Sequence, residues 1–204
     1  MKKILVATNN RGKLERYKRI VKKIDPEINL YSPKDIGIDV VEINEDGTLE
    51  ENAKKKAQSY FGKTDLPILA NDAGFFVKGK GLVRNPKRIA LSKSEDNFSK
   101  EEVFRLVSSY WQNVAKENGG EVDAAWVDAF ALCMPDGNIY ERGARREVIL
   151  TDNILGKTDV EFPIRSLYIS KATKKPAILH TEEEELLEVA PIKEALMELL
   201  KKVR

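Results

Sequence analysis

A short apolar run, a turn and an amphipathic helix follow one another at the start of the chain. Residues 4–8 are mostly apolar, and residues 9–12 form a polar turn that contains a glycine. Apolar residues then recur at spacings of three and four from Leu14 to Ile24, until Pro26. This pattern predicts a buried strand and a helix with one apolar stripe, which proline ends. A strand followed by a helix with one apolar stripe favours folds in which helices cover a sheet.

Further elements are predicted by the same periodicities and by turn residues. Asp136-Gly137 between two apolar runs predicts a β-hairpin, and Thr181 with Glu184 predicts a helix N-terminus. Residues 71–74 are expected to break a strand. The other expected strands are 29–32, 66–70 and 160–170, and the other expected helices are 49–60, 99–116 and one from Pro191 to about residue 203. We therefore predict an α/β fold, a mixed sheet flanked by helices, as a single domain over residues 1–204.

Charge balance limits the classes of partner. The chain has 35 Lys and Arg residues against 33 Asp and Glu residues, whereas nucleic-acid and membrane binding call for a basic excess on one face. The N-terminal apolar run is too short for the core of a signal peptide, and no stretch reaches membrane-spanning length. We expect a cytoplasmic protein that binds neither nucleic acid nor membrane.

The sequence also restricts the metals that the chain can bind. Cys133 is the only cysteine and His180 the only histidine, which excludes a disulfide within the chain, a cysteine-rich zinc site and a multi-histidine site. A metal must then be held mainly by oxygen ligands, which suits Mg²⁺ or Mn²⁺.

Three polar segments could carry chemistry. The first, Thr8 to Lys13, joins a strand to a helix N-terminus, where backbone N–H groups and a lysine favour phosphate. Strand–turn–helix units with a lysine are also common without any phosphate. The second offers a loop carboxylate at Glu45, followed by Asn52 and Lys56 one helical turn apart; it could also be only a solvated helix start.

The third segment, Asn71-Asp72-Ala73-Gly74, follows a buried strand, where open α/β sheets place ligand-binding residues. An Asx turn is the alternative. Together the three segments supply a hard-cation site, cationic groups for phosphate and a base for water, which is what phosphoryl chemistry needs.

These segments, in this order, resemble the inosine triphosphate pyrophosphatase family, which hydrolyses non-standard purine nucleoside triphosphates to monophosphate and pyrophosphate. The resemblance covers roughly residues 1–82 and rests on three motifs. The family's first motif, T-x-N-x-G-K, is matched by Thr8, Asn10, Gly12 and Lys13. Its second motif, an acidic residue, a glycine and an E-N-A-x-x-K-A helix, is matched by Glu45, Gly47, residues 51–53, Lys56 and Ala57. Its third motif, D-D-S-G-L, is matched in part by residues 71–75.

The resemblance implies a fold and a set of roles. The fold would be an elongated mixed sheet in two lobes with the nucleotide in a cleft between them, usually as a homodimer. Glu45 and Asp72 would hold Mg²⁺, or Mn²⁺, and Asp72 with Lys56 would be catalytic, with Asp72 helping to activate water. The substrate-binding residues would be Thr8, Asn9, Asn10, Lys13, Lys56, Asn71, Ala73 and Gly74.

The chain departs from the family at several positions. Arg16 stands where the family has a glutamate, Asn71 replaces the first aspartate of D-D-S-G, and Ala73 replaces its serine. The base-recognition blocks G-F-G-Y-D-P and S-H-R are replaced by residues 160–164 and 190–192. We expect an Mg²⁺-dependent nucleoside triphosphate pyrophosphatase with altered base specificity. A nucleotide-binding sensor without useful catalysis, and a hydrolase of a modified pyrimidine or deoxynucleotide, are the alternatives.

Overall fold

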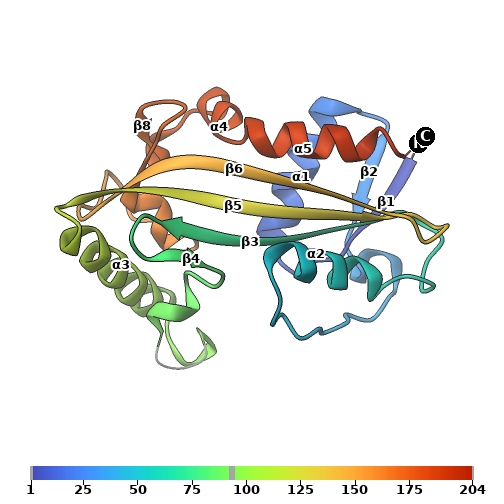
Figure 1. Cartoon of the computed structure of the whole chain (residues 1–204), viewed down its shortest axis with the longest axis horizontal. Coiled ribbons are helices and arrows are strands. Elements are labelled where there is room, and N and C mark those ends of the chain that lie inside the picture. Colours follow the sequence, from blue (N-terminus) through green and yellow to red (C-terminus); the bar gives the residue numbers. More distant parts are fainter. Residues whose placement is uncertain (1, 92–94, 204) are drawn as a thin grey trace. The chain divides into compact units, whose positions relative to one another are not determined.

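The computed structural model describes residues 2–91 and 95–203. It shows an α/β fold in which helices flank a mixed β-sheet (Figure 1). The fold class predicted from the sequence is confirmed. The strands are β1 (Lys2–Val6), β2 (Ile28–Tyr31), β3 (Ile68–Val77), β4 (Gly81–Val83), β5 (Glu121–Cys133), β6 (Ile139–Thr151), β7 (Tyr168–Ser170) and β8 (Lys175–Pro176). The α-helices are α1 (Arg11–Ile24), α2 (Leu49–Gln58), α3 (Lys100–Glu117), α4 (Glu182–Glu188) and α5 (Ala190–Leu200).

The sheet combines parallel and antiparallel strand pairs. Its order is β2-β1-β3-β5-β6-β7-β8, and β4 pairs with β3 outside this path. β1 runs parallel to β2 and to β3, whereas β4, β7 and β8 pair antiparallel to their neighbours. The parallel pairs are joined through α1 and α2, as crossovers between parallel strands require.

The chain divides into two compact units that share strands. Unit 1 comprises residues 1–73, 128–144 and 191–204, and unit 2 comprises residues 74–127 and 145–190. The division falls within β3, β5 and β6. The expectation from the sequence that residues 1–204 form a single domain stays a prediction.

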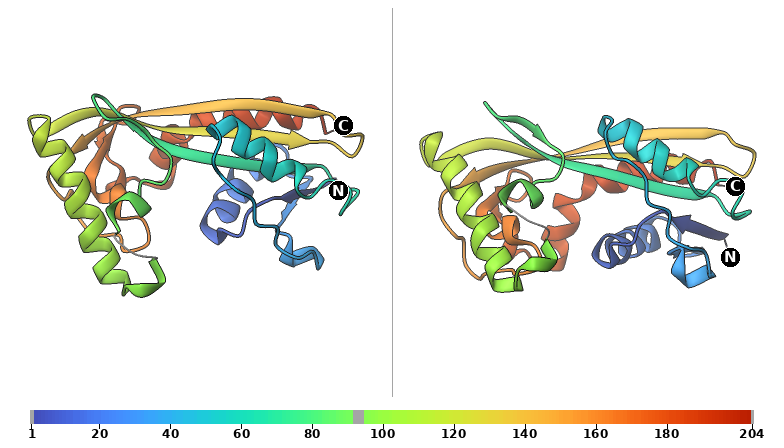
Figure 2. Two further views of the ribbon diagram at one scale, coloured as in Figure 1. Left: turned by 60° about the horizontal axis from the view of Figure 1, so that its bottom comes forward. Right: turned by 90° about the horizontal axis from the view of Figure 1, so that it is seen from below.

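In unit 1, α1 and α2 cover opposite faces of β1 and β3 (Figure 2). The path from β1 to β2 and the path from β2 to β3 run in opposite directions along the sheet, and right-handed crossovers then put their helices on opposite faces. α1 buries one stripe that includes Leu14, Tyr17 and Val21, as the spacing predicts. Tyr17 meets Phe130 of β5 edge to face, with 5.7 Å between ring centroids.

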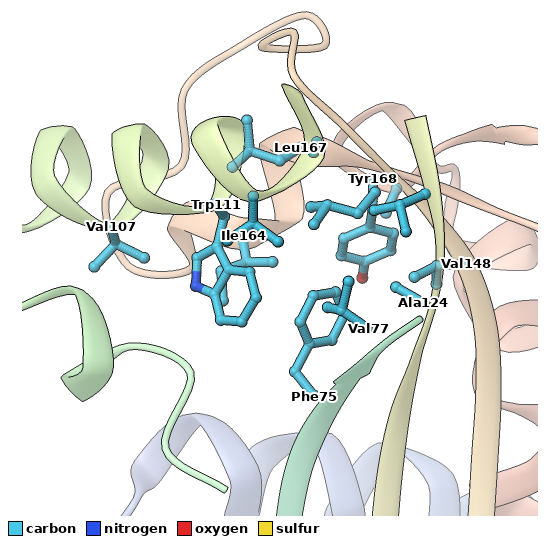
Figure 3. Packing of buried hydrophobic residues seen from close by; sticks show 14 of the residues in the cluster. Phe75, Val77, Val107, Trp111, Ala124, Val148, Ile164, Leu167 and Tyr168 are labelled. Atoms are coloured by element: carbon cyan, nitrogen blue, oxygen red, sulfur yellow. The ribbon is translucent and has the colours of Figure 1, made fainter. Parts of the chain in front are cut away.

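Unit 2 has its own apolar core around Trp111 of α3 (Figure 3). Phe75 of β3 packs edge-on against Trp111, with 5.2 Å between ring centroids, and the Trp111 ring N–H donates to Pro86 O at 2.8 Å. Ile164 and Leu167 complete the same core from a 3₁₀-helix, Pro163–Leu167.

Two of the expected elements are wrong. Residues 71–74 do not break a strand, because β3 continues to Val77. Residues 160–170 form a 3₁₀-helix followed by the short strand β7, since Pro163 lacks the N–H that a ladder needs and has the φ of a helix start. The hairpin at Gly137, with φ of 87°, and the capping box of Thr181 with Glu184 are confirmed. No helix in the described part of the chain is long and apolar enough to cross a bilayer.

Candidate functional site

The candidate site lies in unit 1, where β3 runs beyond the end of β1. β1 pairs with β3 only at Ile68 and Leu69, and Ala7 donates to Leu69 O. Asn71 and Asp72 therefore lie in the middle of β3 but past the last residue of its parallel neighbour. This corrects the expectation that Asp72 follows a strand end, and still puts both residues outside the carboxyl end of β1.

Both polar residues of β3 are buried. Asn71 is 7% exposed and Asp72 is 6% exposed. A buried carboxylate needs a charged or hydrogen-bonding partner, because desolvation penalises an unpaired ion strongly. Each of the two residues is contacted by a lysine from a different helix, Asn71 by Lys13 and Asp72 by Lys56.

The first helix brings Lys13 to Asn71. Asn10 caps α1, because its side-chain oxygen accepts the backbone N–H of Lys13 at 2.9 Å, and Thr8 Oγ1 accepts the N–H of Asn10 at 3.1 Å. Lys13 Nζ donates to Asn71 Oδ1 at 2.9 Å. Burial lowers the pKa of Lys13 below its usual value, and the negative charge of Asp128 opposes that shift.

The turn before α1 also borders a cavity of about 330 Å³. Thr8, Asn9 and Asn10 line it together with Ser32 and Asp35, which follow β2. Three of the predicted substrate-binding residues therefore border a space that can admit a ligand, whereas Lys13 contacts Asn71 of β3.

The second helix brings Asn52 and Lys56 to Asp72. Thr48 and Glu51 form a capping box at the start of α2. One turn later, Asn52 Oδ1 accepts the backbone N–H of Gly47 at 3.1 Å, and Asn52 Nδ2 donates to Asp72 Oδ2 at 3.0 Å. Asn52 thus ties the loop before α2 to the carboxylate of Asp72.

Lys56 lies between two carboxylates. Its Nζ is 2.8 Å from Asp72 Oδ1 and 3.0 Å from Glu45 Oε1. These two carboxylate oxygens cannot be farther apart than the two distances added together, so the structure brings the two predicted metal ligands to one place. Within residues 2–91 and 95–203, no three Asp, Glu, His or Cys side chains gather as metal ligands. Two carboxylates still fit Mg²⁺, which is commonly bound by one or two carboxylates plus substrate phosphates.

Gly74 of the third motif lies beside a different element, the strand β4. Gly74 is fixed by the antiparallel strand β4, since a Cβ at this position would lie 2.9 Å from Leu82 Cδ1 and 3.0 Å from Val83 O. The close approach of β4 therefore requires a glycine at position 74. A contact of Ala73 or Gly74 with substrate stays a prediction.

Sequence reasoning missed Asp128. This residue of β5 is 3% exposed, and its Oδ1 accepts from Asn71 Nδ2 at 3.3 Å. It is the one charged residue in the run from Ala124 to Cys133. A lone carboxylate within a buried strand is the signal that could have found it.

Two conspicuous residues of unit 2 have partners of their own. Arg165 donates to Ala177 O at 3.2 Å and pairs with Glu185 at 3.3 Å. The side chain of His180 is fully buried, and its Nδ1 lies 3.1 Å from Glu188 Oε2. This setting indicates a structural role for the single histidine.

Comparisons with known proteins identify relatives of this chain. The model of the Ham1 family matches residues 4–154. The dITP/XTP pyrophosphatase of Geobacter sulfurreducens is 34% identical over 157 residues, which are 76% of this chain and 75% of that protein. The dITP/XTP pyrophosphatase of Wigglesworthia glossinidia brevipalpis is 40% identical over 78 residues, 38% of this chain and 37% of that protein.

A solved structure shows the same fold over the whole chain. The HAM1 protein from Coxiella burnetii superimposes with a TM-score of 0.74 at 21% identity and covers 99% of this chain and 100% of its own. The resemblance drawn from the three motifs is therefore confirmed by the family model, by curated relatives and by the fold. This chain belongs to the Ham1 family.

Proposed function

We propose that this protein is a nucleoside triphosphate pyrophosphatase that depends on Mg²⁺ and hydrolyses a (deoxy)nucleoside triphosphate to the monophosphate and pyrophosphate. The observation that carries the proposal is the convergence of Glu45, Lys56 and Asp72. The names of the curated relatives, dITP/XTP pyrophosphatases, support the same class of hydrolase.

The residues divide the work of the reaction. Lys13 and Lys56 bind the negative phosphate oxygens, and Asp72 accepts a proton from the attacking water. The new bond forms between the water oxygen and the α-phosphorus, the bond from the α-phosphorus to the oxygen shared with the β-phosphorus breaks, and pyrophosphate leaves with the bonding electrons. Mg²⁺ held by Glu45 and Asp72 would neutralise charge on the phosphate oxygens.

Base specificity is proposed to differ from that of the family. A site that hydrogen-bonds a base edge rejects analogues strongly, because its buried polar groups are otherwise left unpaired. Neither base-recognition block of the family is present in the sequence, and Arg165, which directly follows residues 160–164, is paired with Glu185. We therefore expect no large and exclusive preference for inosine or xanthosine triphosphate.

The resemblance also implies a homodimer, which sedimentation velocity would test.

Pyrophosphate release from a panel of nucleoside triphosphates tests the proposal. The panel contains inosine, xanthosine and the four ordinary ribo- and deoxyribonucleoside triphosphates, each with and without Mg²⁺. We expect Mg²⁺-dependent release of pyrophosphate, with kcat/KM for inosine triphosphate not standing far above all others. An exclusive preference for inosine or xanthosine triphosphate would contradict the proposed specificity but not the activity.

Binding without hydrolysis is the second candidate function. It is favoured by Asn71, which puts an amide where the family has a carboxylate. Tight nucleotide binding with no turnover of any substrate in the panel would support this candidate against the first.

A further inference from the structure

The amide of Asn71 has a fixed orientation. Its Nδ2 faces three oxygens: Asp72 O at 3.0 Å, Ala129 O at 3.1 Å and Asp128 Oδ1 at 3.3 Å. Its Oδ1 accepts from Lys13 Nζ at 2.9 Å. A lysine can only donate, and the three oxygens can only accept, so the flipped amide would lose every one of these bonds.

An aspartate would not fit at position 71 beside Asp128. The side-chain atom that now donates to three oxygens would become a fourth oxygen, and two carboxylates would be buried against each other. The residue types at positions 71 and 128 are therefore coupled. With Asp128 present, the buried negative charge lies on β5, and β3 supplies the neutral amide that connects this charge to Lys13.

We propose that Asp128 is a positioning residue for triphosphate binding, which acts through Asn71 on Lys13 and supplies the carboxylate that the D-D-S-G motif places on β3. This inference rests on the proposed function, since it assumes that Lys13 binds phosphate.

A double-mutant cycle tests the coupling between positions 71 and 128. The variants are Asn71→Asp, Asp128→Asn and the combination of both, and the readout is the dissociation constant for inorganic tripolyphosphate with Mg²⁺, measured by calorimetry. We expect Asn71→Asp to weaken binding about 100-fold and Asp128→Asn about 30-fold, as coupling energies between contacting residues allow. In the combination, the carboxylate on β3 would accept directly from Lys13 while the amide on β5 donates to that carboxylate, so binding should return to within about tenfold of the wild type.

A purely structural role would give a different pattern. If Asp128 is a positioning residue, Asp128→Asn should raise KM for nucleotide and hardly change kcat. Adding Asn71→Asp to the Asp128→Asn variant should then restore binding. The exposed Asp65→Asn is the matched control and should bind tripolyphosphate as the wild type does. If Asn71→Asp alone does not fold, the double variant must still bind more tightly than Asp128→Asn.

The outcomes separate this inference from the proposed function. A wild-type protein that binds no tripolyphosphate contradicts both. Wild-type binding, with single-variant losses that simply multiply in the double variant or with no loss in Asp128→Asn, contradicts the inference alone.

Discussion

Asp72 binds two different partners with its two carboxylate oxygens. Asn52 donates to Oδ2 and Lys56 donates to Oδ1, so α2 fixes the plane of the carboxylate. A base that accepts a proton from water works best when its oxygens are held in place before substrate binds. At the scale of single residues, this orientation distinguishes Asp72 from the more exposed Glu45.

Asp72→Asn should abolish most of the hydrolytic activity, whereas the variant should still bind phosphate groups. The amide cannot accept the proton from water, so we expect kcat to fall about 100-fold or more. Tripolyphosphate affinity measured without Mg²⁺ should change far less, because Lys13 and Lys56 remain. Asp46→Asn is the matched control, since Asp46 is an exposed carboxylate paired with Lys55, and it should stay within about twofold of the wild type. Equal kcat in both variants would remove Asp72 from catalysis.

Lys56→Ala should have opposite effects on metal binding and on catalysis. The ammonium now offsets one of the two negative charges of Glu45 and Asp72, and a unit charge at this range is worth about fivefold in affinity even in water. We expect Mn²⁺ to bind about fivefold more tightly without nucleotide, as followed by electron paramagnetic resonance, while kcat/KM falls. Lys55→Ala should change neither quantity. Weaker Mn²⁺ binding in the Lys56→Ala variant would contradict a shared cation site.

At the scale of elements, the junction between the acidic loop and α2 depends on a close approach. A Cβ at Gly47 would lie 2.6 Å from Glu51 Oε2 and 2.9 Å from Glu51 Cβ. Glu51 belongs to the capping box of α2, and Gly47 itself is bonded to Asn52. The glycine of the motif therefore lets the loop with Glu45 reach the start of the helix that carries Lys56.

Gly47→Ala should move this junction and weaken both the fold and the site. We expect a loss of about 1–3 kcal/mol in the free energy of unfolding, the usual cost of forcing extra atoms into filled space, together with a lower kcat/KM. Urea denaturation and the pyrophosphate assay measure the two effects. Gly143→Ala is the control, because a Cβ there would lie at an ordinary 3.8 Å from Asp128 O. Unchanged stability in Gly47→Ala would show that Glu51 moves aside freely.

Local signals in the sequence predicted the helices and the hairpin well. The stripe of α1, the capping box at Thr181 and the turn at Gly137 depend on neighbours within a few residues, and such contacts are visible in a sequence. The continuation of β3 past Asn71 was missed because it depends on the antiparallel partner β4 and on where β1 ends. Asp128 was missed for the same reason, since its role depends on a neighbouring strand.

At the scale of the whole molecule, the two units differ in what their buried polar groups do. Those of unit 1 form the candidate site. In unit 2, Glu188 is 5% exposed and accepts from Tyr168 Oη at 2.9 Å and from Arg146 at 3.2 Å, and His180 lies beside it. Burial and the charge of Glu188 raise the pKa of Tyr168, which stays neutral and donates.

Glu188→Ala should destabilise unit 2 strongly. Removing the carboxylate leaves Arg146 buried without this counter-charge, and breaking a buried pair in this way typically costs about 3–5 kcal/mol. Denaturation followed by the fluorescence of Trp111 and Trp126 measures the effect. Glu183→Ala, an exposed change on the same helix, should have almost no effect. A loss below about 1 kcal/mol would mean that the carboxylate does not stabilise unit 2.

Identification of the products by ³¹P NMR tests the proposed activity most directly. Wild-type protein, a nucleoside triphosphate that it turns over and Mg²⁺ should give nucleoside monophosphate and pyrophosphate in equal amounts. Over the time in which the wild type consumes its substrate, the Asp72→Asn variant should leave nearly all of the triphosphate intact. Formation of nucleoside diphosphate and orthophosphate, or the same products at the same rate from Asp72→Asn, would contradict a pyrophosphatase centred on Glu45, Lys56 and Asp72.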